Sequence, residues 1–291
     1  MNDLTLGVDV SDVIAKLAIV SRDDIVSQGI LAPLRVDGIR DAAKKAIAGA
    51  KGKVGAVAVA LPSAGEQVPA DLVEALAGIG KGAPIAIAAG TAAAIAERWR
   101  GGAREASEVI AFSIAEHVTA GVLIGGKPWL GAHGLAASVQ WMALNPVERE
   151  DYRKLGSLEA EVASAGIVRR FVWRIKSGDQ SNVADHVKGD FSRITAADIL
   201  QGARDGDGVS ISVVRDTARY IGMAVANLAT MFDPEVVVLG GSIASSGDLM
   251  FEAIRAETVR RLLPQQVGRV RVELSTLEDD AIAIGAARSL A

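Results

Sequence analysis

Short apolar runs alternate with longer amphipathic stretches along most of the chain. The runs have the length of strands, and the stretches carry apolar residues at the spacing of a helix face. Helices that cover a largely parallel sheet produce this order. The expected strands are residues 4–10, 15–21, 54–61, 85–88, 108–114, 119–124, 236–239 and 270–274, and the expected helices are residues 36–50, 70–79, 91–100, 158–176, 210–231 and 279–291. The pattern predicts an α/β protein.

Each half of the chain opens with two short strands joined by a polar turn, and the first of these turns contains Ser11 and Asp12. Gly101 and Gly102 end the first series of elements, because glycine disfavours continuation of a helix. The same order then starts again, so we expect two lobes. The first lobe comprises residues 1–104 plus 280–291, and the second comprises residues 105–279.

Residues 233–247, DPEVVVLGGSIASSG, predict a buried strand that runs through a glycine turn into a helix. Gly240 and Gly241 lack Cβ atoms, so a nucleotide base or ribose can lie against the backbone there. Glycines at such a turn also serve close packing between a strand and a helix. Both uses of Gly240, Gly241 and the neighbouring Ser242 remain open at this point.

Composition narrows the classes of function. The 291-residue chain is long for a single hydrophobic core, which favours two lobes. A net charge of −4 and a pI near 5.5 provide no basic surface for nucleic acid, so we expect no nucleic-acid partner. The chain has no cysteine, which excludes disulfides and thiolate zinc sites. No apolar run reaches the ~18 residues of a membrane span, so we expect a cytoplasmic protein with no membrane partner.

Two segments carry a resemblance to a known family. GGKPWLGAHGLAASVQWM at residues 125–142 aligns without a gap with the pattern NGKxxxGAxGxAGEIGHM, and TAAAIAE at residues 91–97 aligns with NAAALAE. With the hairpin-led lobes, these segments resemble the ROK family of sugar kinases and repressors, in a degenerate form. The resemblance implies a two-lobed actin-like ATPase (ribonuclease H-like) fold. It also implies transfer of the ATP γ-phosphate to a sugar hydroxyl, with Mg²⁺, between the lobes.

The resemblance assigns both hairpin turns to the phosphates of ATP. The family's first turn reads DxGGT, and this chain has Asp9, Ser11 and Asp12 there, with Asp9 as a candidate for binding Mg²⁺ through water. The second turn reads GTG, and this chain has Glu116 and His117 there. A carboxylate ~4 Å from a phosphate is unfavourable by about 4 kcal/mol at an effective dielectric near 20. Serine and aspartate are equally typical of a simple turn, and Glu116 and His117 are either an acid/base pair or two exposed turn residues.

The catalytic base of the family is the aspartate of its NDAN segment. Ala89 occupies that position in this chain, and Ala88 replaces the preceding asparagine. Alanine cannot accept a proton from a sugar hydroxyl. Thr91, two residues further along, is the expected N-cap of the helix over residues 91–100.

The sugar contacts of the family are also replaced. Its ExGH contacts correspond to Ser138 and Trp141, and its GCLE segment corresponds to GSLE, in which Glu159 is the candidate sugar contact. Trp141 either stacks on a sugar or packs in an interface or core. Ser157 and Glu159 equally suit the first turn of a helix, where a hydroxyl cap and a carboxylate are favourable. The family's zinc cluster CxCGxxGC has no counterpart, so we expect no structural zinc.

The leading hypothesis is a noncatalytic ROK-like protein with a binding, sensing or scaffold role and a sugar or nucleotide as its ligand. The alternative is a divergent, glucokinase-like kinase that uses ATP and Mg²⁺ to phosphorylate a hexose, with Asp9 and either Asp279 or Asp280. A repressor is the third hypothesis, but no helix-turn-helix pattern precedes Leu4. The family commonly forms dimers, so we expect a homodimer with the alanine-rich residues 135–142 in its interface.

Overall fold

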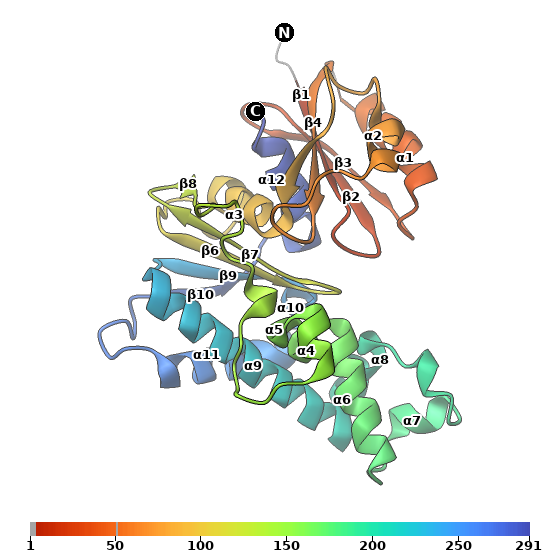
Figure 1. Cartoon of the computed structure of the whole chain (residues 1–291), viewed down its shortest axis with the longest axis vertical. Coiled ribbons are helices and arrows are strands. Elements are labelled where there is room, and N and C mark those ends of the chain that lie inside the picture. Colours follow the sequence, from red (N-terminus) through yellow and green to blue (C-terminus); the bar gives the residue numbers. More distant parts are fainter. Residues whose placement is uncertain (1–3, 51) are drawn as a thin grey trace.

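The computed structural model describes residues 4–50 and 52–291, with side chains throughout except at residues 243 and 244. Within this part of the chain, strands form two five-stranded sheets, each with helices packed on it (Figure 1). This arrangement confirms the predicted α/β class. No helix in the described residues is both long and apolar enough to cross a membrane.

The first sheet has the strand order β3-β2-β1-β4-β5. Its strands are β1 (Leu4–Asp9), β2 (Ala15–Val20), β3 (Ile25–Leu31), β4 (Val54–Leu61) and β5 (Ile85–Ala88). The first three pair antiparallel, whereas β4 lies parallel to both β1 and β5. Helices α1 (Val36–Ala48) and α2 (Ala70–Leu76) cover an aliphatic core that includes Leu6, Val8, Leu17, Ile19 and Ile39. We call these elements the N-terminal lobe.

The second sheet has the order β10-β9-β6-β7-β8. Its strands are β6 (Val109–Ile114), β7 (Val118–Ile124), β8 (Lys127–Pro128), β9 (Val236–Gly241) and β10 (Arg271–Leu274). Helices α4 (Glu150–Leu155), α5 (Ser157–Val162), α6 (Ser164–Lys176), α7 (Asn182–His186), α8 (Ala196–Arg204), α9 (Gly208–Phe232), α10 (Ser242–Ser245) and α11 (Gly247–Arg261) complete the C-terminal lobe. The long helix α9 begins where the Asp207 side chain accepts a hydrogen bond from the backbone N–H of Ser210.

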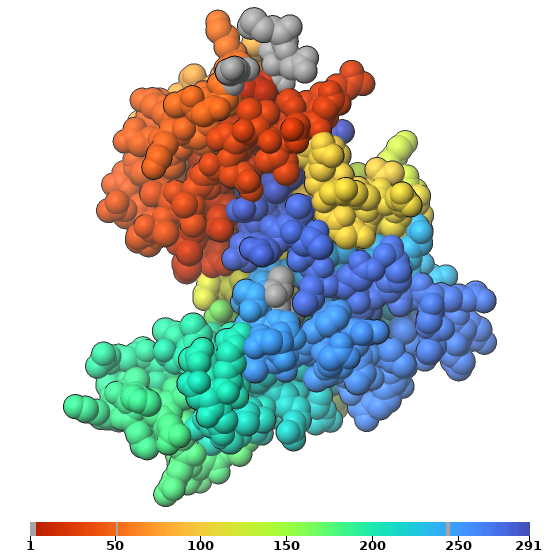
Figure 2. Space-filling view, turned by 180° about the vertical axis from the view of Figure 1, so that it is seen from behind, coloured from red at the N-terminus to blue at the C-terminus, as the bar shows by residue number. Residues whose placement is uncertain are grey.

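Two alanine-rich helices, α3 (Ala89–Arg100) and α12 (Ala281–Arg288), lie between the two sheets (Figure 1). Seen from behind, the blue C-terminal segment lies between the red and orange N-terminal lobe and the other lobe (Figure 2). The lobe boundary at residues 104 and 280 stays a proposal. It is supported by the packing of α12 on β1.

Backbones approach one another closely along this boundary, at four glycines that we call the glycine seam: Gly7, Gly90, Gly121 and Gly285. A Cβ atom at Gly7 would overlap the backbone of α12, and one at Gly285 would overlap the Ala92 carbonyl of α3. Gly90 of α3 and Gly121 of β7 exclude side chains from each other in the same way. The seam therefore connects β1, α12, α3 and β7 through backbone contact.

Two local predictions were wrong in detail. The helix expected to start at Thr91 begins at Ala89, and its N-cap residue Ala88 makes no side-chain capping bond. β5 runs directly into α3, so packing against β7 rather than a cap fixes the start of this helix. β3 was not predicted at all, because it is an edge strand with polar residues such as Ser27 and Gln28 in its middle.

Candidate functional site

A cavity of about 820 Å³ lies between the lobes, and we call it the cleft. The turn between β1 and β2 lines it with Ser11 and Asp12, and the turn between β6 and β7 lines it with Glu116 and His117. Glu159 of α5 completes this side of the cleft. Parts of the chain more than 100 residues apart in sequence thus meet at one site.

Asp9 lies at the end of β1 and is only 3% exposed. Its Oδ1 accepts hydrogen bonds from the backbone N–H of Ser11 at 2.9 Å and from the Ser11 hydroxyl at 2.6 Å. Burial nevertheless raises the pKa of Asp9 to about 6, although these bonds lower it. The first turn therefore engages one of the two oxygens of the Asp9 carboxylate internally.

Further carboxylates surround a small pocket next to Asp9, which Lys16, Thr119 and Asp279 also line. Burial raises the pKa of Asp279, and nearby carboxylates oppose its ionisation further. Lys16 lies 3.6 Å from the Asp280 carboxylate, so its charge is shared with that group. The balance of charge around the pocket is acidic.

His117 forms a pair with Glu159, in which the ring Nδ1 lies 3.2 Å from Oε1. The other Glu159 oxygen accepts a hydrogen bond from the backbone N–H of Val118 at 3.0 Å, which fixes the carboxylate. The hydrogen bond to Glu159 is the main reason why the pKa of His117 is raised. The structure thus brings His117 together with Glu159, which lies 42 residues away, whereas the sequence suggested its neighbour Glu116.

Glu159 lies in the first helical turn of α5 and also lines the cleft. The residue before this helix, Gly156, has a positive φ of 92° and lies against the backbone of Gln140. Gly156, rather than Ser157, is the N-cap residue, so the hydroxyl cap considered for Ser157 does not form. The two readings of Glu159, as a helix-start residue and as a residue of the site, are compatible.

Ala89 is the first residue of α3 and is fully buried. It packs in an alanine cluster with Ala58, Ala60, Ala92 and Ala286. A methyl group in this environment offers no acceptor for a proton. At the position that the resemblance assigns to the family's catalytic aspartate, this chain has part of its apolar core.

The two glycines that end β9 have a clear packing role. Gly241 has a φ of 73°, and a Cβ atom there would overlap the Ile114 carbonyl. At Gly240, a Cβ atom would lie 2.7 Å from the Ser113 hydroxyl. Ser242 donates a hydrogen bond to the Ile114 carbonyl at 2.8 Å and lines a separate cavity of about 700 Å³ beside α8. The nucleotide role of these three residues stays a prediction.

Ser138 and Trp141 lie apart from the cleft. Ser138 precedes the short 3-10 turn Val139–Trp141, and Trp141 is its last residue. The Ser138 hydroxyl donates a hydrogen bond to the Leu135 carbonyl at 2.7 Å, and Trp141 is 54% exposed. In the described part of the chain, neither lines the cavity that contains Glu159. Their role as sugar contacts stays a prediction.

Sequence reasoning missed six polar residues that line these spaces, namely Thr119, Asp151, Arg169, Lys16, Ser113 and Glu278. Thr119 is buried in β7, and its hydroxyl has no partner among the described residues. A threonine within the apolar run VTAGVLI is a local signal that can be recognised. Asp151 and Arg169 lie on amphipathic helices and form an ion pair that no local pattern predicts.

The donor set does not fit a Mg²⁺–ATP complex. At nucleotide sites, magnesium is held by one or two carboxylates together with phosphate oxygens and water. Asp9 is engaged by Ser11, and Asp12 and Glu116 would bring negative charge toward the phosphates.

The fold is shared with solved sugar kinases. A ROK family glucokinase from Streptomyces griseus, solved in complex with glucose and AMPPNP, matches with a TM-score of 0.78 at 24% identity over 99% of each chain. A ROK hexokinase from Thermus thermophilus matches with a TM-score of 0.74 at 19% identity, covering 98% of this chain and 97% of the hexokinase. The two lobes thus form the predicted actin-like ATPase fold.

Relatives in sequence include both enzymes and regulators. A glucokinase from Halalkalibacterium halodurans is 29% identical over 196 residues, 66% of this chain and 59% of the glucokinase. A xylose repressor from Caldicellulosiruptor bescii is 28% identical over 200 residues, 67% of this chain and 48% of the repressor. The matches thus span about half to three-fifths of these relatives. The sequence pattern of the ROK family matches residues 37–291, and the chain belongs to the ROK family.

Proposed function

We propose that this ROK protein binds a sugar in the cleft without transferring phosphate to it, in a sensing or scaffold role. The observation that carries this proposal is Ala89, fully buried at the position of the family's catalytic aspartate. The family contains both kinases and repressors, so the fold is used with and without catalysis. The glucokinase from Streptomyces griseus was solved with glucose, which suggests the ligand class.

The charges at the cleft support the noncatalytic part of the proposal. Asp12 and Glu116 lie on the two turns that would face phosphates. Each carboxylate ~4 Å from a phosphate opposes binding by about 4 kcal/mol at an effective dielectric near 20. A neutral sugar is not subject to this repulsion, so the same cleft favours a sugar over a nucleotide triphosphate.

The His117–Glu159 pair supports the binding part of the proposal. Both residues line the cleft, and together they offer a ring N–H donor and carboxylate acceptors for sugar hydroxyls. Because the backbone N–H of Val118 and the His117 ring both hold the Glu159 carboxylate, the pair is oriented before a ligand arrives. Preorganised polar groups of this kind give a small-molecule site its specificity.

The same pair is the one observation that favours the alternative, a divergent ATP-dependent hexose kinase. A histidine oriented by a carboxylate is a common general base. The raised pKa of His117 works against this role, because it increases the fraction of protonated ring at neutral pH. We therefore rank the kinase second.

Calorimetry and a turnover assay separate the two functions. We expect saturable binding of glucose, mannose or N-acetylglucosamine, and no sugar-dependent release of ADP from ATP and Mg²⁺. Glu159→Gln should weaken sugar binding about tenfold, as expected for loss of a charged hydrogen-bond acceptor. The exposed Glu252→Gln, on α11, is the matched control and should bind normally.

Two results would overturn the proposal. Sugar-dependent ADP formation that is abolished by Asp9→Ala would establish the kinase instead. Absence of binding to all three sugars would remove the sugar-binding role. Ala89→Asp alone should not produce turnover, because Asp12 and Glu116 remain on the two turns.

We also propose a homodimer that acts in the cytoplasm. Four exposed apolar side chains, Trp129, Leu130, Leu135 and Trp141, follow one another between β8 and α4 and suit an interface between copies. Light scattering should then give twice the 30.1 kDa chain mass. Trp141→Ser should shift the protein toward monomer, whereas Trp173→Ser on α6 should not. The absence of cysteine from the sequence suits a reducing compartment.

A further inference from the structure

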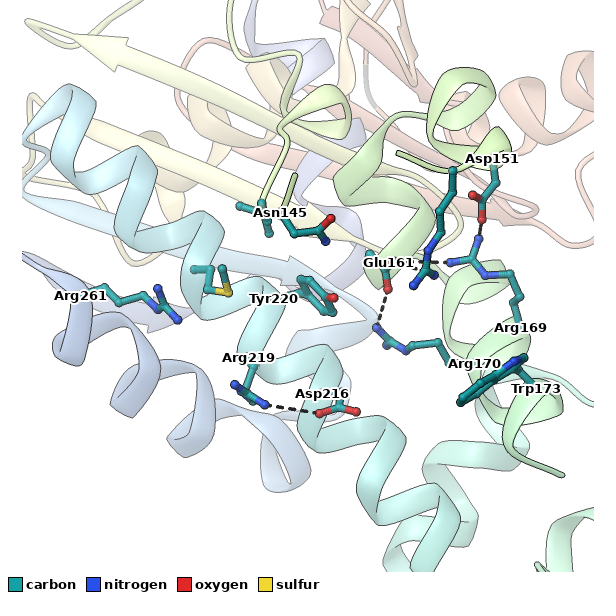
Figure 3. Close-up of a pocket in the computed structure, with 13 residues that line it drawn as sticks. Asn145, Asp151, Glu161, Arg169, Arg170, Trp173, Asp216, Arg219, Tyr220 and Arg261 are labelled. Atoms are coloured by element: carbon teal, nitrogen blue, oxygen red, sulfur yellow. Dashed lines mark hydrogen bonds and ion pairs between the residues drawn. The ribbon is translucent and has the colours of Figure 1, made fainter. Parts of the chain in front are cut away.

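A second cavity, of about 660 Å³, lies in the C-terminal lobe between the segment before α4 and helices α5, α6 and α9 (Figure 3). We call it the arginine pocket. The guanidinium groups that line it come from Arg149, Arg169, Arg170, Arg219 and Arg261. The pocket adjoins the cleft, with which it shares only Asp151 and Arg169 among the lining residues.

The lining carries more positive than negative charge. Five arginines line the pocket with three carboxylates, those of Asp151, Glu161 and Asp216. Arg261 also pairs with Glu257 outside the lining at 2.5 Å, which leaves a formal excess of one positive charge. Glu161 is only 3% exposed and is shared among three arginines, with nitrogen to oxygen distances between 3.1 and 3.8 Å. Asp151 also pairs with Arg169, so these three guanidinium groups face only two carboxylates.

Arg170 shows that the network is incomplete. Its side chain is 15% exposed, and it extends from α6 toward Glu161 and Tyr220 (Figure 3). One terminal nitrogen contacts Glu161 at 3.1 Å and the other contacts the Thr217 hydroxyl, but Nε is buried without a partner among the described residues. Burial lowers the pKa of Arg170, and burial together with Arg149 and Arg170 lowers the pKa of Arg169. A bound anion would relieve this shortage of negative charge.

We propose that the arginine pocket binds the phosphate group of a small molecule, either as inorganic phosphate or as a phosphate monoester. A phosphate group supplies the missing negative charge, and its three terminal oxygens accept hydrogen bonds from guanidinium groups that approach from different elements. A carboxylate has only two oxygens and one negative charge, so it satisfies fewer of these donors than a phosphate does. The volume exceeds that of phosphate alone, and Leu144, Tyr220 and Met223 supply apolar wall for an organic group.

The test is calorimetry with two probes, inorganic phosphate and glycerol 3-phosphate, which has no sugar ring to occupy the cleft. We expect saturable binding with a Kd of about 1 mM or tighter. The variant Arg149→Gln with Arg219→Gln should weaken binding at least about tenfold. These side chains are 50% and 59% exposed, so the protein should fold without them.

The matched control is Arg255→Gln with Arg271→Gln, which removes the same charge from side chains that are 52% and 51% exposed outside the pocket. It should retain the wild-type affinity, and so should His117→Gln in the cleft. Similar affinities for the two probes identify free phosphate as the ligand, and tighter binding of glycerol 3-phosphate identifies a monoester. Both results support the proposal.

Three results would overturn it. The first is the absence of saturable binding of either probe up to about 10 mM, a concentration about ten times the weakest Kd that we expect. The second is an equal loss of affinity in the control double variant, which would indicate nonspecific attraction to positive charge. The third is loss of binding in His117→Gln alone, which would place the phosphate in the cleft.

Discussion

The glycine seam and the two hairpin turns are neighbours at the lobe boundary, but they follow opposite rules. At the seam, Gly7 and Gly285 leave no space for even a single Cβ atom. At the turns, Asp12 and Glu116 carry charged side chains into an open cavity of about 820 Å³. In the seam, packing therefore limits the size of each residue. In the turns, only the bound ligand limits which residues are acceptable.

This difference explains how a protein can keep the fold of a sugar kinase while its site diverges. A substitution in the seam would separate the helices that join the lobes, so the fold itself restricts the residues there. A substitution in a turn changes the ligand and leaves packing intact. Ala89 lies next to Gly90 of the seam and belongs to the alanine core, at the position that the resemblance assigns to the catalytic base.

The largest effect should come from the seam. Gly285→Ala places a Cβ atom against the Ala92 backbone, which cannot move without shifting α3, so we expect the free energy of unfolding to fall by about 3 kcal/mol or more. Gly208→Ala is the control, because a Cβ atom there meets nothing within 4 Å and alanine favours the start of α9. Chemical denaturation of both variants measures the difference. Similar stabilities would show that the seam is not sterically constrained.

A smaller effect should come from Asp9, and it should depend on pH. The pKa of Asp9 is raised from 3.8 to about 6 by burial, so between these values the native state holds a proton that the unfolded chain has lost. Native stability therefore falls as pH rises through this range and stays lower above it. Asp9→Asn removes this loss and should stabilise the protein by about 1 to 3 kcal/mol at pH 8, with little effect at pH 4.

Thermal denaturation across pH 4 to 8 tests this prediction. The control is Asp41→Asn on the exposed face of α1, which should show no comparable difference between the two ends of the range. If Asp9→Asn instead destabilised the protein at pH 8, the ionised carboxylate would be the stabilising form, and the raised pKa of Asp9 would be wrong.

The smallest effect should be local to the second turn. Glu159→Gln removes the charge that most strongly raises the pKa of His117, so that pKa should fall toward its ordinary value. Glu116→Gln should lower the pKa of His117 less, because Glu116 contributes least among the groups that raise it. A proton NMR titration of the histidine ring distinguishes them. Equal falls would show that His117 is not paired with Glu159 in solution.

Much of the fold was predictable because its signals are local. The strand and glycine turn at residues 233–247 follow from an apolar run and two glycines, and the structure has β9 and α10 there. β3 escaped prediction because its residues alternate between half-buried and exposed positions at the edge of a sheet, so they lack a strong apolar pattern. Thr91 was wrongly predicted to be the N-cap. The helix begins two residues earlier, at Ala89, so Thr91 lies inside it.

The sequence by itself determined the α/β class and the family, because each depends on residue types at fixed spacing. Tertiary structure alone decided which charges meet. Glu159 pairs with His117 across 42 residues, and Arg149, Arg170 and Arg219 converge from separate elements on one pocket. Electrostatic interaction depends on distance in space, and the distance between two side chains is set only when the elements that carry them pack together.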